Sequence, residues 1–315
     1  MKLLLPDSVE LQPHLPTDVH AVRYAVGRPV PGEHTDADAL VVWGNSADQL
    51  RDTAARLPRL RWVQTLAAGP DAVLQAGFAP GVVVTSGAGL HDRTVAEHAL
   101  ALVLAAARRL HLLVRAQIGH RWAQEWGGLQ PLREPDSFRT LRDAHVVIWG
   151  FGGIAGTLAP LLAALGARIT GVARAAGTRH GFPVVTAGDF PEILPAADVL
   201  IMILPAAADT DHALDARVLD LLPDHAWVVN VGRGSTVDEA ALLAAIRAGR
   251  LGGAALDVTE TEPLPPGSGL WDEPNVIISP HAAGGRPLGA DELVSENLAA
   301  LLGGRPLRNV VERGN

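Results

Sequence analysis

The chain of 315 residues contains no cysteine. Disulfide bonds, thiolate-bound zinc and a thiol nucleophile are therefore excluded. Aromatic residues make up only 4% and charged residues 19%, and the usual charged share is about 25%. Hydrophobic residues nevertheless reach 48%, which excludes an intrinsically disordered chain. The length predicts two domains, each large enough to have its own core.

Positive charge is also scarce. The 26 Lys and Arg residues stand against 34 Asp and Glu, so the net charge is −8, and general binding to nucleic acid is not expected. No apolar run approaches the roughly 20 residues that span a bilayer, and the N-terminus lacks the apolar core of a signal peptide. We expect a cytoplasmic protein without nucleic-acid, membrane or metal partners. Lys2 is the single lysine, so any one arginine is weak evidence for guanidinium chemistry.

Short apolar runs alternate with helical patterns along the chain. Strands are predicted at 40–43, 62–66, 82–85, 146–149, 168–173, 199–204, 227–231, 253–256 and 276–279. Helices are predicted at 46–57, 94–111, 157–165, 239–248 and 291–302. This alternation is typical of α/β proteins with doubly wound parallel sheets. The segment 117–139 has no regular pattern and is expected to form a long surface excursion.

The helical pattern at 94–111 is the longest in the chain. Thr94 and Glu97 have the spacing of a capping box, which predicts that the helix begins at Thr94. Leucine, valine and alanine recur at helical spacing after it. A helix this apolar needs extensive cover, either as a core helix between two domains or as a subunit interface.

A glycine-rich turn follows the predicted strand at 146–149. Its residues, Gly150-Phe151-Gly152-Gly153-Ile154-Ala155, fit the pattern G-x-G-x-x-A between a strand and a helix. The first two glycines permit a tight turn and the close approach of a pyrophosphate, and the small Ala155 lets the helix pack on the strand. The N-terminus of the helix directs N–H groups at the phosphates. We therefore predict a dinucleotide-binding domain. Pro160 inside the helix is expected to kink it or to remove a hydrogen bond.

The end of the next strand predicts which dinucleotide binds. An acidic residue about 20 positions after the glycines holds the ribose 2′-hydroxyl of NAD, whereas arginine accommodates the 2′-phosphate of NADP. Here Ala173 is followed by Arg174 and, shortly after, by Arg179. NADP(H) is therefore the preferred cofactor, with NAD(H) as the alternative if Arg174 is an ordinary surface residue. Leu204-Pro205 and Val231-Gly232, at the ends of two further strands, are also expected to line the cofactor.

Three successive strands end in residues with anion-binding or acid–base chemistry. Arg233 follows the first, Asp257 and Glu262 follow the second, and His281 follows the third. In open α/β sheets, ligands bind at the carboxyl ends of the strands. An arginine can bind a carboxylate in bidentate fashion. A histidine beside a carboxylate keeps its proton and can donate it to a carbonyl oxygen.

Taken together, these motifs resemble those of the D-isomer-specific 2-hydroxyacid dehydrogenases over nearly the whole chain. The resemblance is carried by Gln64–Gly69, Gly150–Ala155, Asn230–Gly234, Ala255–Val258, Glu262–Leu264, Pro280-His281 and Gly304–Val311. It implies two doubly wound parallel-sheet domains, with a Rossmann-type cofactor domain at 93–282 inserted into a discontinuous substrate domain at 1–92 and 283–315. It also implies homodimers, because Val95–Glu97 and Arg108-Arg109 resemble the start of the family's dimer-forming region.

The resemblance also implies roles for single residues. Arg233 would bind the carboxylate and carbonyl of the substrate, His281 would transfer the proton, and Glu262 would set the pKa of His281. Asp257 would contact the nicotinamide end of the cofactor. Ala68-Gly69 would belong to the loop that binds the substrate carboxylate, together with Arg233 and His281.

The predicted function is therefore the NADPH-dependent reduction of a small 2-oxo acid, such as glyoxylate or hydroxypyruvate, to the D-2-hydroxy acid. Two alternatives stay open. One is a dinucleotide-sensing binding protein or corepressor on the same fold. The other is a dehydrogenase of an unusual acid in the same cleft.

Overall fold

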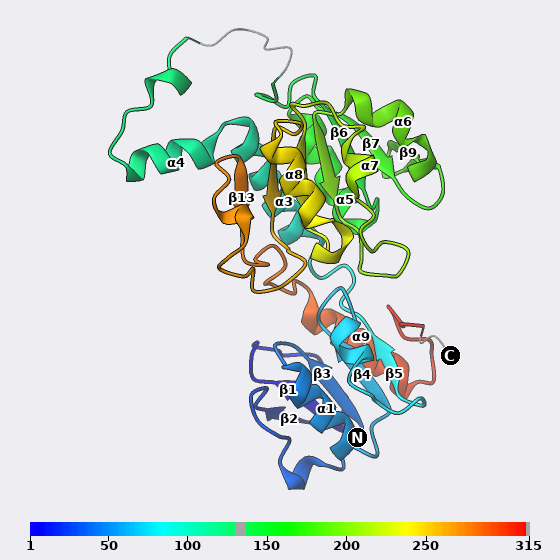
Figure 1. Ribbon diagram of the computed structural model, residues 1–315. Coiled ribbons are helices and arrows are strands. Elements are labelled where there is room, and N and C mark those ends of the chain that lie inside the picture. Colours follow the sequence, from blue (N-terminus) through cyan, green and yellow to red (C-terminus); the bar gives the residue numbers. More distant parts are fainter. Residues whose placement is uncertain (130–136, 313–315) are drawn as a thin grey trace. The chain divides into compact units, whose positions relative to one another are not determined.

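The computed structural model describes residues 1–129 and 137–312 (Figure 1). The chain divides into two compact units, and each is described by itself. Unit 1 comprises Met1–His91 with Arg286–Asn315, and unit 2 comprises Asp92–Gly285. Unit 1 is thus discontinuous in the sequence. The predicted domain boundaries at 92 and 283 lie within three residues of those of the two units.

Unit 1 contains a five-stranded sheet with the order β2-β1-β3-β4-β5, and all of its strand pairs are parallel. The strands are β1 (Lys2–Pro6), β2 (His20–Tyr24), β3 (Ala39–Val42), β4 (Trp62–Thr65) and β5 (Val83–Thr85). Its helices are α1 (Ala47–Arg56), α2 (Asp71–Leu74), α9 (Ala290–Leu302) and the short 3-10 helix η1 (Gly32–His34). The C-terminal helix α9 packs on the N-terminal sheet, because Leu293, Val294 and Leu298 share a core with residues of β1, β3 and β4. Both ends of the chain therefore build one unit.

Unit 2 contains an eight-stranded sheet with the order β13-β12-β11-β10-β6-β7-β9-β8, parallel except for the pair β8–β9. The strands are β6 (His145–Trp149), β7 (Arg168–Val172), β8 (Gly177–Arg179), β9 (Phe182–Val185), β10 (Val199–Met202), β11 (Trp227–Asn230), β12 (Gly253–Leu256) and β13 (Val276–Ile278). The strand order reverses at β6, which pairs with both β7 and β10. In doubly wound sheets such a switch point marks the ligand-binding edge.

Helices cover both faces of the sheet in unit 2. They are α3 (Asp92–Ala107), α4 (Leu110–Ile118), α5 (Gly153–Ala164), α6 (Phe190–Ile193), α7 (Ala216–Leu219) and α8 (Glu239–Arg247). Short 3-10 helices lie at η2 (Gln124–Trp126), η3 (Ala187–Asp189), η4 (Leu194–Ala196), η5 (Gly234–Thr236) and η6 (Gly269–Trp271).

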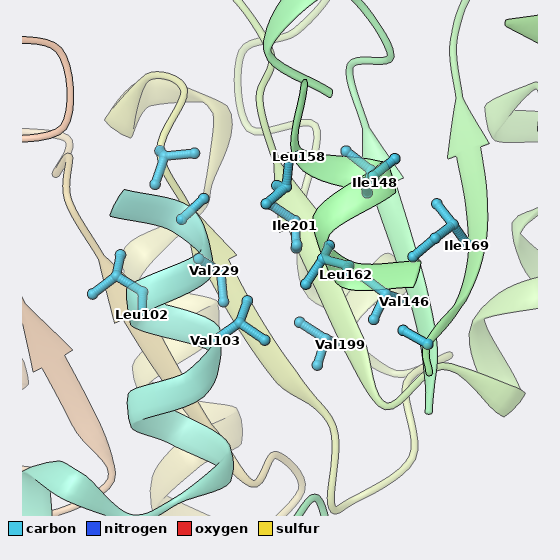
Figure 2. Packing of buried hydrophobic residues seen from close by; sticks show 14 of the residues in the cluster. Leu102, Val103, Val146, Ile148, Leu158, Leu162, Ile169, Val199, Ile201 and Val229 are labelled. Atoms are coloured by element: carbon cyan, nitrogen blue, oxygen red, sulfur yellow. The ribbon is translucent and has the colours of Figure 1, made fainter. Parts of the chain in front are cut away.

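The two faces of this sheet form two separate cores. On one face Val146 and Ile148 of β6 pack with α3 and α5, as Figure 2 shows for Leu102, Leu158 and Leu162. On the other face lie Val147, Leu200, Val228 and residues of α6, α7 and α8. Neighbouring residues of one strand thus face opposite cores. This explains why the strands are continuous apolar runs in the sequence, as expected for a parallel sheet covered on both faces.

The predicted helix at 94–111 is two helices. Helix α3 begins at Asp92, so Thr94 lies inside it, and the predicted cap at Thr94 is wrong. Helix α3 ends at Ala107 and α4 starts at Leu110, because Arg109 takes a left-handed backbone conformation with φ 53° that interrupts the helix. The cover of α3 comes from unit 2 itself, since Val95, Ala99 and Val103 share the core of α5.

Two other expectations concern the segment 117–139 and Pro160. The excursion predicted at 117–139 contains the end of α4 and η2, and residues 130–136 lie outside the described residues. Pro160 does lie inside α5, and the helix continues past it to Ala164. Strands β1, β2, β8 and β9 were not predicted.

Candidate active site

The glycine-rich turn joins β6 to α5 at the switch point of the sheet. Gly150 has φ +100°, and a Cβ atom at this position would lie 2.5 Å from the carbonyl oxygen of Ile203. Gly152 is the N-cap residue of α5, and a Cβ atom there would meet nothing within 4 Å. A Cβ atom at the next residue, Gly153, would lie 2.1 Å from Oδ2 of Asp92, so the Asp92 carboxylate lies against the first turn of α5. A glycine-rich turn that leads into the N-terminus of a helix fits the pyrophosphate of a dinucleotide.

The other residues of the motif pack inward. Ala155 is fully buried, and Phe151 is 3% exposed and lies edge-on to Phe182 of β9. Ile154 is partly buried against the core shared by α3 and α5. The side chains of these three residues hold the turn in place, so a bound cofactor would meet their backbone.

Two guanidinium groups lie after β7. Ala173 follows the last residue of the strand, Arg174 lies in the turn after it, and Arg179 ends β8. Arg179 Nη2 donates to the carbonyl oxygen of Ala175 at 3.2 Å. Arg174 Nη2 lies 3.5 Å from Oδ2 of Asp209, which belongs to the loop after β10. The structure thus adds an acidic residue that the sequence pattern did not predict, and it faces the arginine expected to bind the 2′-phosphate.

The loops after β10 and β11 lie side by side. Leu204 and Val231 are buried, whereas Pro205 is exposed on the segment that follows β10. A Cβ atom at Gly232 would lie 2.6 Å from the carbonyl oxygen of Leu204. The predicted cofactor positions in these loops are therefore neighbours, with their backbones in contact.

Arg233 stands on a tightly bonded turn after β11. The buried Asn230 donates from Nδ2 to the Arg233 carbonyl oxygen at 3.0 Å and accepts from the N–H of Gly232 at 3.0 Å. Thr236 Oγ1 donates to the same Arg233 carbonyl oxygen at 2.6 Å. The guanidinium is half-buried, and its Nη1 donates to the carbonyl oxygen of Gly232 at 2.9 Å. The backbone of the turn thus sets the base from which the guanidinium extends.

Glu262 and His281 form a hydrogen-bonded pair. Nδ1 of His281 lies 2.8 Å from Oε2 of Glu262, and about half of each side chain is exposed. The second carboxylate oxygen of Glu262 accepts from the N–H of Thr259 at 3.3 Å. Because a carboxylate accepts hydrogen bonds, Nδ1 carries a proton. Nε2, on the far side of the ring, then points away from Glu262.

Asp257 is buried and hydrogen-bonded to the segment that carries His281. The residue is 2% exposed, and its carboxylate accepts from Ser279 Oγ at 2.6 Å and from the N–H groups of Ala282 and Ala283 at 2.9 Å and 3.0 Å. Nε2 of His98, on α3, lies 3.2 Å from Oδ1 of Asp257. The carboxylate thus anchors the segment that carries His281. A contact between Asp257 and the nicotinamide stays a prediction.

The predicted substrate loop follows β4 in unit 1. Ala68 is exposed and Gly69 half-buried. The preceding Leu66 is fully buried, and its carbonyl oxygen lies 2.8 Å from Nε2 of His91. The ring of His91 is stacked on the half-buried Trp43, with ring centroids 5.4 Å apart. The contact between Leu66 and His91 therefore fixes one end of the loop.

A model of the D-isomer-specific 2-hydroxyacid dehydrogenase family, NAD-binding domain, matches residues 100–283. This range covers more than half of the chain. The chain belongs to the D-isomer-specific 2-hydroxyacid dehydrogenases. The family, the fold class and the enzyme class predicted from the sequence are thereby confirmed. As a member with this domain, the dehydrogenase uses a nicotinamide dinucleotide.

Relatives extend this similarity beyond the cofactor domain. A glyoxylate reductase from Aeropyrum pernix is 33% identical over 272 residues, which are 83% of this chain and 79% of that protein. Glyoxylate/hydroxypyruvate reductase A from Klebsiella pneumoniae is 32% identical over 299 residues, 90% of this chain and 88% of the relative.

Solved structures of family members superpose on the dehydrogenase over nearly its whole length. A D-isomer-specific 2-hydroxyacid dehydrogenase from Xanthobacter autotrophicus, in complex with NADPH and MES, has a TM-score of 0.80 and 30% identity, covering 99% of this chain and 97% of that one. An NADPH-dependent glyoxylate/hydroxypyruvate reductase from Sinorhizobium meliloti, in complex with NADP and sulfate, has a TM-score of 0.79 and 25% identity, covering 99% and 98%.

Two observations concern partners of the dehydrogenase. Among the described residues, no helix is both long and apolar enough to span a bilayer. Within the same residues, no cluster of three histidine, aspartate or glutamate side chains could hold a metal ion.

Sequence reasoning missed His98 and Asp209. Each contacts a predicted site residue, His98 through Asp257 and Asp209 through Arg174. Asp209 lies after β10, outside the strand end in which an acidic residue is normally sought. His98 lies within an apolar helix, where its position gives no sign of its partner.

Proposed function

We propose that the dehydrogenase reduces small 2-oxo acids, such as glyoxylate or hydroxypyruvate, to D-2-hydroxy acids with NADPH. The observation that carries the proposal is the hydrogen bond of 2.8 Å between His281 and Glu262. The turn of Arg233 touches the segment of Glu262, since a Cβ atom at Gly234 would lie 1.9 Å from the Thr259 carbonyl oxygen. A proton donor and a guanidinium are thus held on adjoining loops at one edge of the sheet.

The reaction assigns a task to each of these residues. A nicotinamide bound in unit 2 would supply the hydride that the carbonyl carbon receives. The Arg233 guanidinium binds the substrate carboxylate and polarises the carbonyl. The proton for the carbonyl oxygen comes from Nε2 of His281, which faces away from Glu262. Glu262 accepts the hydrogen bond from Nδ1 of His281 throughout, so it keeps the ring oriented.

The two units take different parts in this proposal. Unit 2 binds the cofactor, with the pyrophosphate at the N-terminus of α5. In unit 1, the binding of the substrate carboxylate by Ala68-Gly69 stays a prediction.

NADPH is the proposed cofactor because Arg174 and Arg179 both follow β7 in the sequence. The complexes of two relatives with NADPH and with NADP support this choice. Asp209 opposes it in part, since its carboxylate lies 3.5 Å from the Arg174 guanidinium. Arg174 is largely exposed, so solvent weakens this ion pair. We therefore propose a preference for NADPH and not an exclusion of NADH.

We also propose that the enzyme is a homodimer through α4. Leu110, Val114 and Ile118 recur at intervals of four residues along α4 and are exposed, and the exposed Trp122 follows the end of the helix. Figure 1 shows α4 leading away from the sheet of unit 2. Such an exposed apolar row is typical of a protein interface. A monomeric mass in light scattering would contradict this part of the proposal.

The proposal is tested by following the oxidation of NADPH and NADH over a panel of 2-oxo acids. Turnover of glyoxylate or hydroxypyruvate is expected, with the higher kcat/KM for NADPH. His281→Ala should lower kcat by about 10²–10⁴, the usual contribution of a positioned general acid. His20→Ala, an exposed histidine on the edge strand β2, is the control and should keep kcat. Binding of NADPH without turnover of any acid would favour a dinucleotide-sensing protein and overturn the proposal.

A further inference from the structure

His98 contacts Asp257 and Ser279, which hold the segment that carries His281. It lies on α3, and its Nε2 is 2.9 Å from Ser279 Oγ and 3.2 Å from Asp257 Oδ1. The Asp257 side chain is 1% exposed and that of His98 25%. The proposed reaction gives His98 no task, although it shares a hydrogen-bond network with the segment that carries His281.

Asp257 holds this segment through several bonds. Its carboxylate accepts from Ser279 Oγ and from two backbone N–H groups after His281, and its carbonyl oxygen accepts from the His281 N–H at 2.7 Å. His281 has φ 51°, a left-handed conformation that is unfavourable for a residue with a Cβ atom. Such a conformation persists only where the surroundings over-determine it. Here the hydrogen bonds to Asp257 hold His281 in this conformation.

The direction of the hydrogen bonds follows from the chemistry of the groups. Ser279 has a single hydroxyl proton, which goes to the Asp257 carboxylate at 2.6 Å. The Ser279 oxygen can therefore only accept from His98, so Nε2 of His98 carries a proton. His98 is then a donor to both Ser279 Oγ and Asp257 Oδ1. It completes the coordination of a buried carboxylate, and a buried carboxylate that loses a donor is costly.

We infer that His98 is a positioning residue for His281, acting through Asp257. The N–H of His98 holds Ser279 and Asp257, Asp257 holds residues 279–283, and these residues aim the His281 ring at Glu262. This inference rests on the proposed function, in which His281 delivers the proton. A displacement of about 1 Å at a reacting group can cost about 10² in rate, so His98 should influence kcat without touching the substrate.

The first test asks whether His98 acts through its N–H donor or through the bulk of its side chain. His98→Leu removes the N–H, and His98→Gln keeps one at similar reach. With glyoxylate and NADPH, His98→Leu should lower kcat by about 10–100-fold and change the KM for NADPH by less than about threefold. His98→Gln should recover most of kcat. If both variants lose kcat equally, or neither does, His98 does not act by donating a hydrogen bond and the inference fails.

A matched control lies at the amino ends of the strands of the same sheet, whereas His281 follows a carboxyl end. Nε2 of His225 is 3.0 Å from Oδ1 of Asp198, just before β10. His225→Leu also breaks a histidine–aspartate pair in unit 2, but far along the strands from His281. It should change the melting temperature and leave kcat near the wild-type value. A kcat loss equal to that of His98→Leu would mean that both act by loosening the fold, against the inference.

The second test is a double-mutant cycle. If His98 acts only through His281, adding His98→Leu to His281→Ala should reduce the remaining rate by less than about twofold, because coupled residues are not additive. A full multiplicative loss would overturn the inference. If His98→Leu does not fold, Ser279→Ala takes its place, since it removes the same link to Asp257. An unimpaired His281→Ala would refute the proposed function itself, whereas an impaired His281→Ala with a normal His98→Leu refutes this inference alone.

Discussion

Substituting alanine at Gly234 should uncouple Arg233 from the pair formed by Glu262 and His281. A Cβ atom at Gly234 would lie 1.9 Å from the carbonyl oxygen of Thr259 and 2.6 Å from the N atom of Glu260. Both neighbours are backbone atoms, which cannot rotate away as a side chain would. The loops after β11 and β12 must therefore separate.

The size of this shift sets the expected effect. An ordinary carbon–oxygen contact requires about 1.5 Å more separation than the 1.9 Å available. Overpacking of this kind usually costs about 1–3 kcal/mol of folding free energy. A misplacement of about 1 Å between a binding group and a catalytic group can cost about 10² in rate. We expect Gly234→Ala to lower kcat/KM for glyoxylate about 100-fold, with a modest decrease in melting temperature.

The assay is NADPH oxidation at saturating cofactor, together with thermal unfolding of the same preparations. Gly267→Ala is the control, since a Cβ atom at Gly267 meets nothing within 4 Å. It should keep both kcat/KM and the melting temperature. A folded Gly234→Ala variant with the kcat/KM of the wild type would show that the contact between the two loops does not position Arg233, and the reasoning would be refuted.

Three further predictions follow from single contacts. Arg233→Lys should lower kcat/KM for glyoxylate at least about tenfold, because an ammonium group cannot replace the planar bidentate fork; an unchanged value would make Arg233 a structural residue. Asp209→Asn removes the carboxylate 3.5 Å from Arg174 and should raise the NADPH-to-NADH ratio of kcat/KM by up to about fivefold, the range of an exposed ion pair; a constant ratio would mean that Arg174 does not meet the 2′-phosphate. Burial lowers the pKa of His145 below its ordinary value of 6.5, so the folded state resists protonation and the free energy of unfolding should fall as the pH drops below 6.5. In urea titrations at about pH 7.5 and about pH 5.5, His145→Gln should lessen this decrease, and an equal decrease in the variant would contradict the assignment.

The buried strands of unit 2 are predictable because each is covered on both faces. Strands such as β10 and β12 are therefore short apolar runs, which the sequence shows directly. Strand β8 gives no such signal, since all three of its residues are exposed, and it is held only by its antiparallel pairing with β9. The sequence also gives no sign of the break at Arg109, because no glycine or proline marks the end of the helix there. The backbone of Arg109 nevertheless takes a left-handed conformation.

The residues of the candidate site likewise comprise some that the sequence predicts and some that it does not. Arg233, Glu262 and His281 are predictable because each follows a recognisable strand, and parallel strands bring their carboxyl ends to one edge. His98 is not, because its partner Ser279 lies 181 residues away and nothing in an apolar helix indicates the contact. Asp209 is missed for a different reason. It lies in the loop after β10, whereas the usual acidic residue stands just after β7, where this chain has Ala173.

The two glycines beside Arg233 are as necessary to this part of the motif as the arginine itself. A Cβ atom at Gly232 would lie 2.6 Å from the carbonyl oxygen of Leu204, and one at Gly234 would lie 1.9 Å from that of Thr259. Arg233 is thus wedged between the loop after β10, which borders the proposed cofactor site, and the loop after β12, which carries Glu262. We expect the backbone from which this guanidinium extends to move little when substrate binds. Its pre-organisation therefore comes from the neighbouring glycines as much as from the arginine, because electrostatic stabilisation is most effective when the charge is already in position.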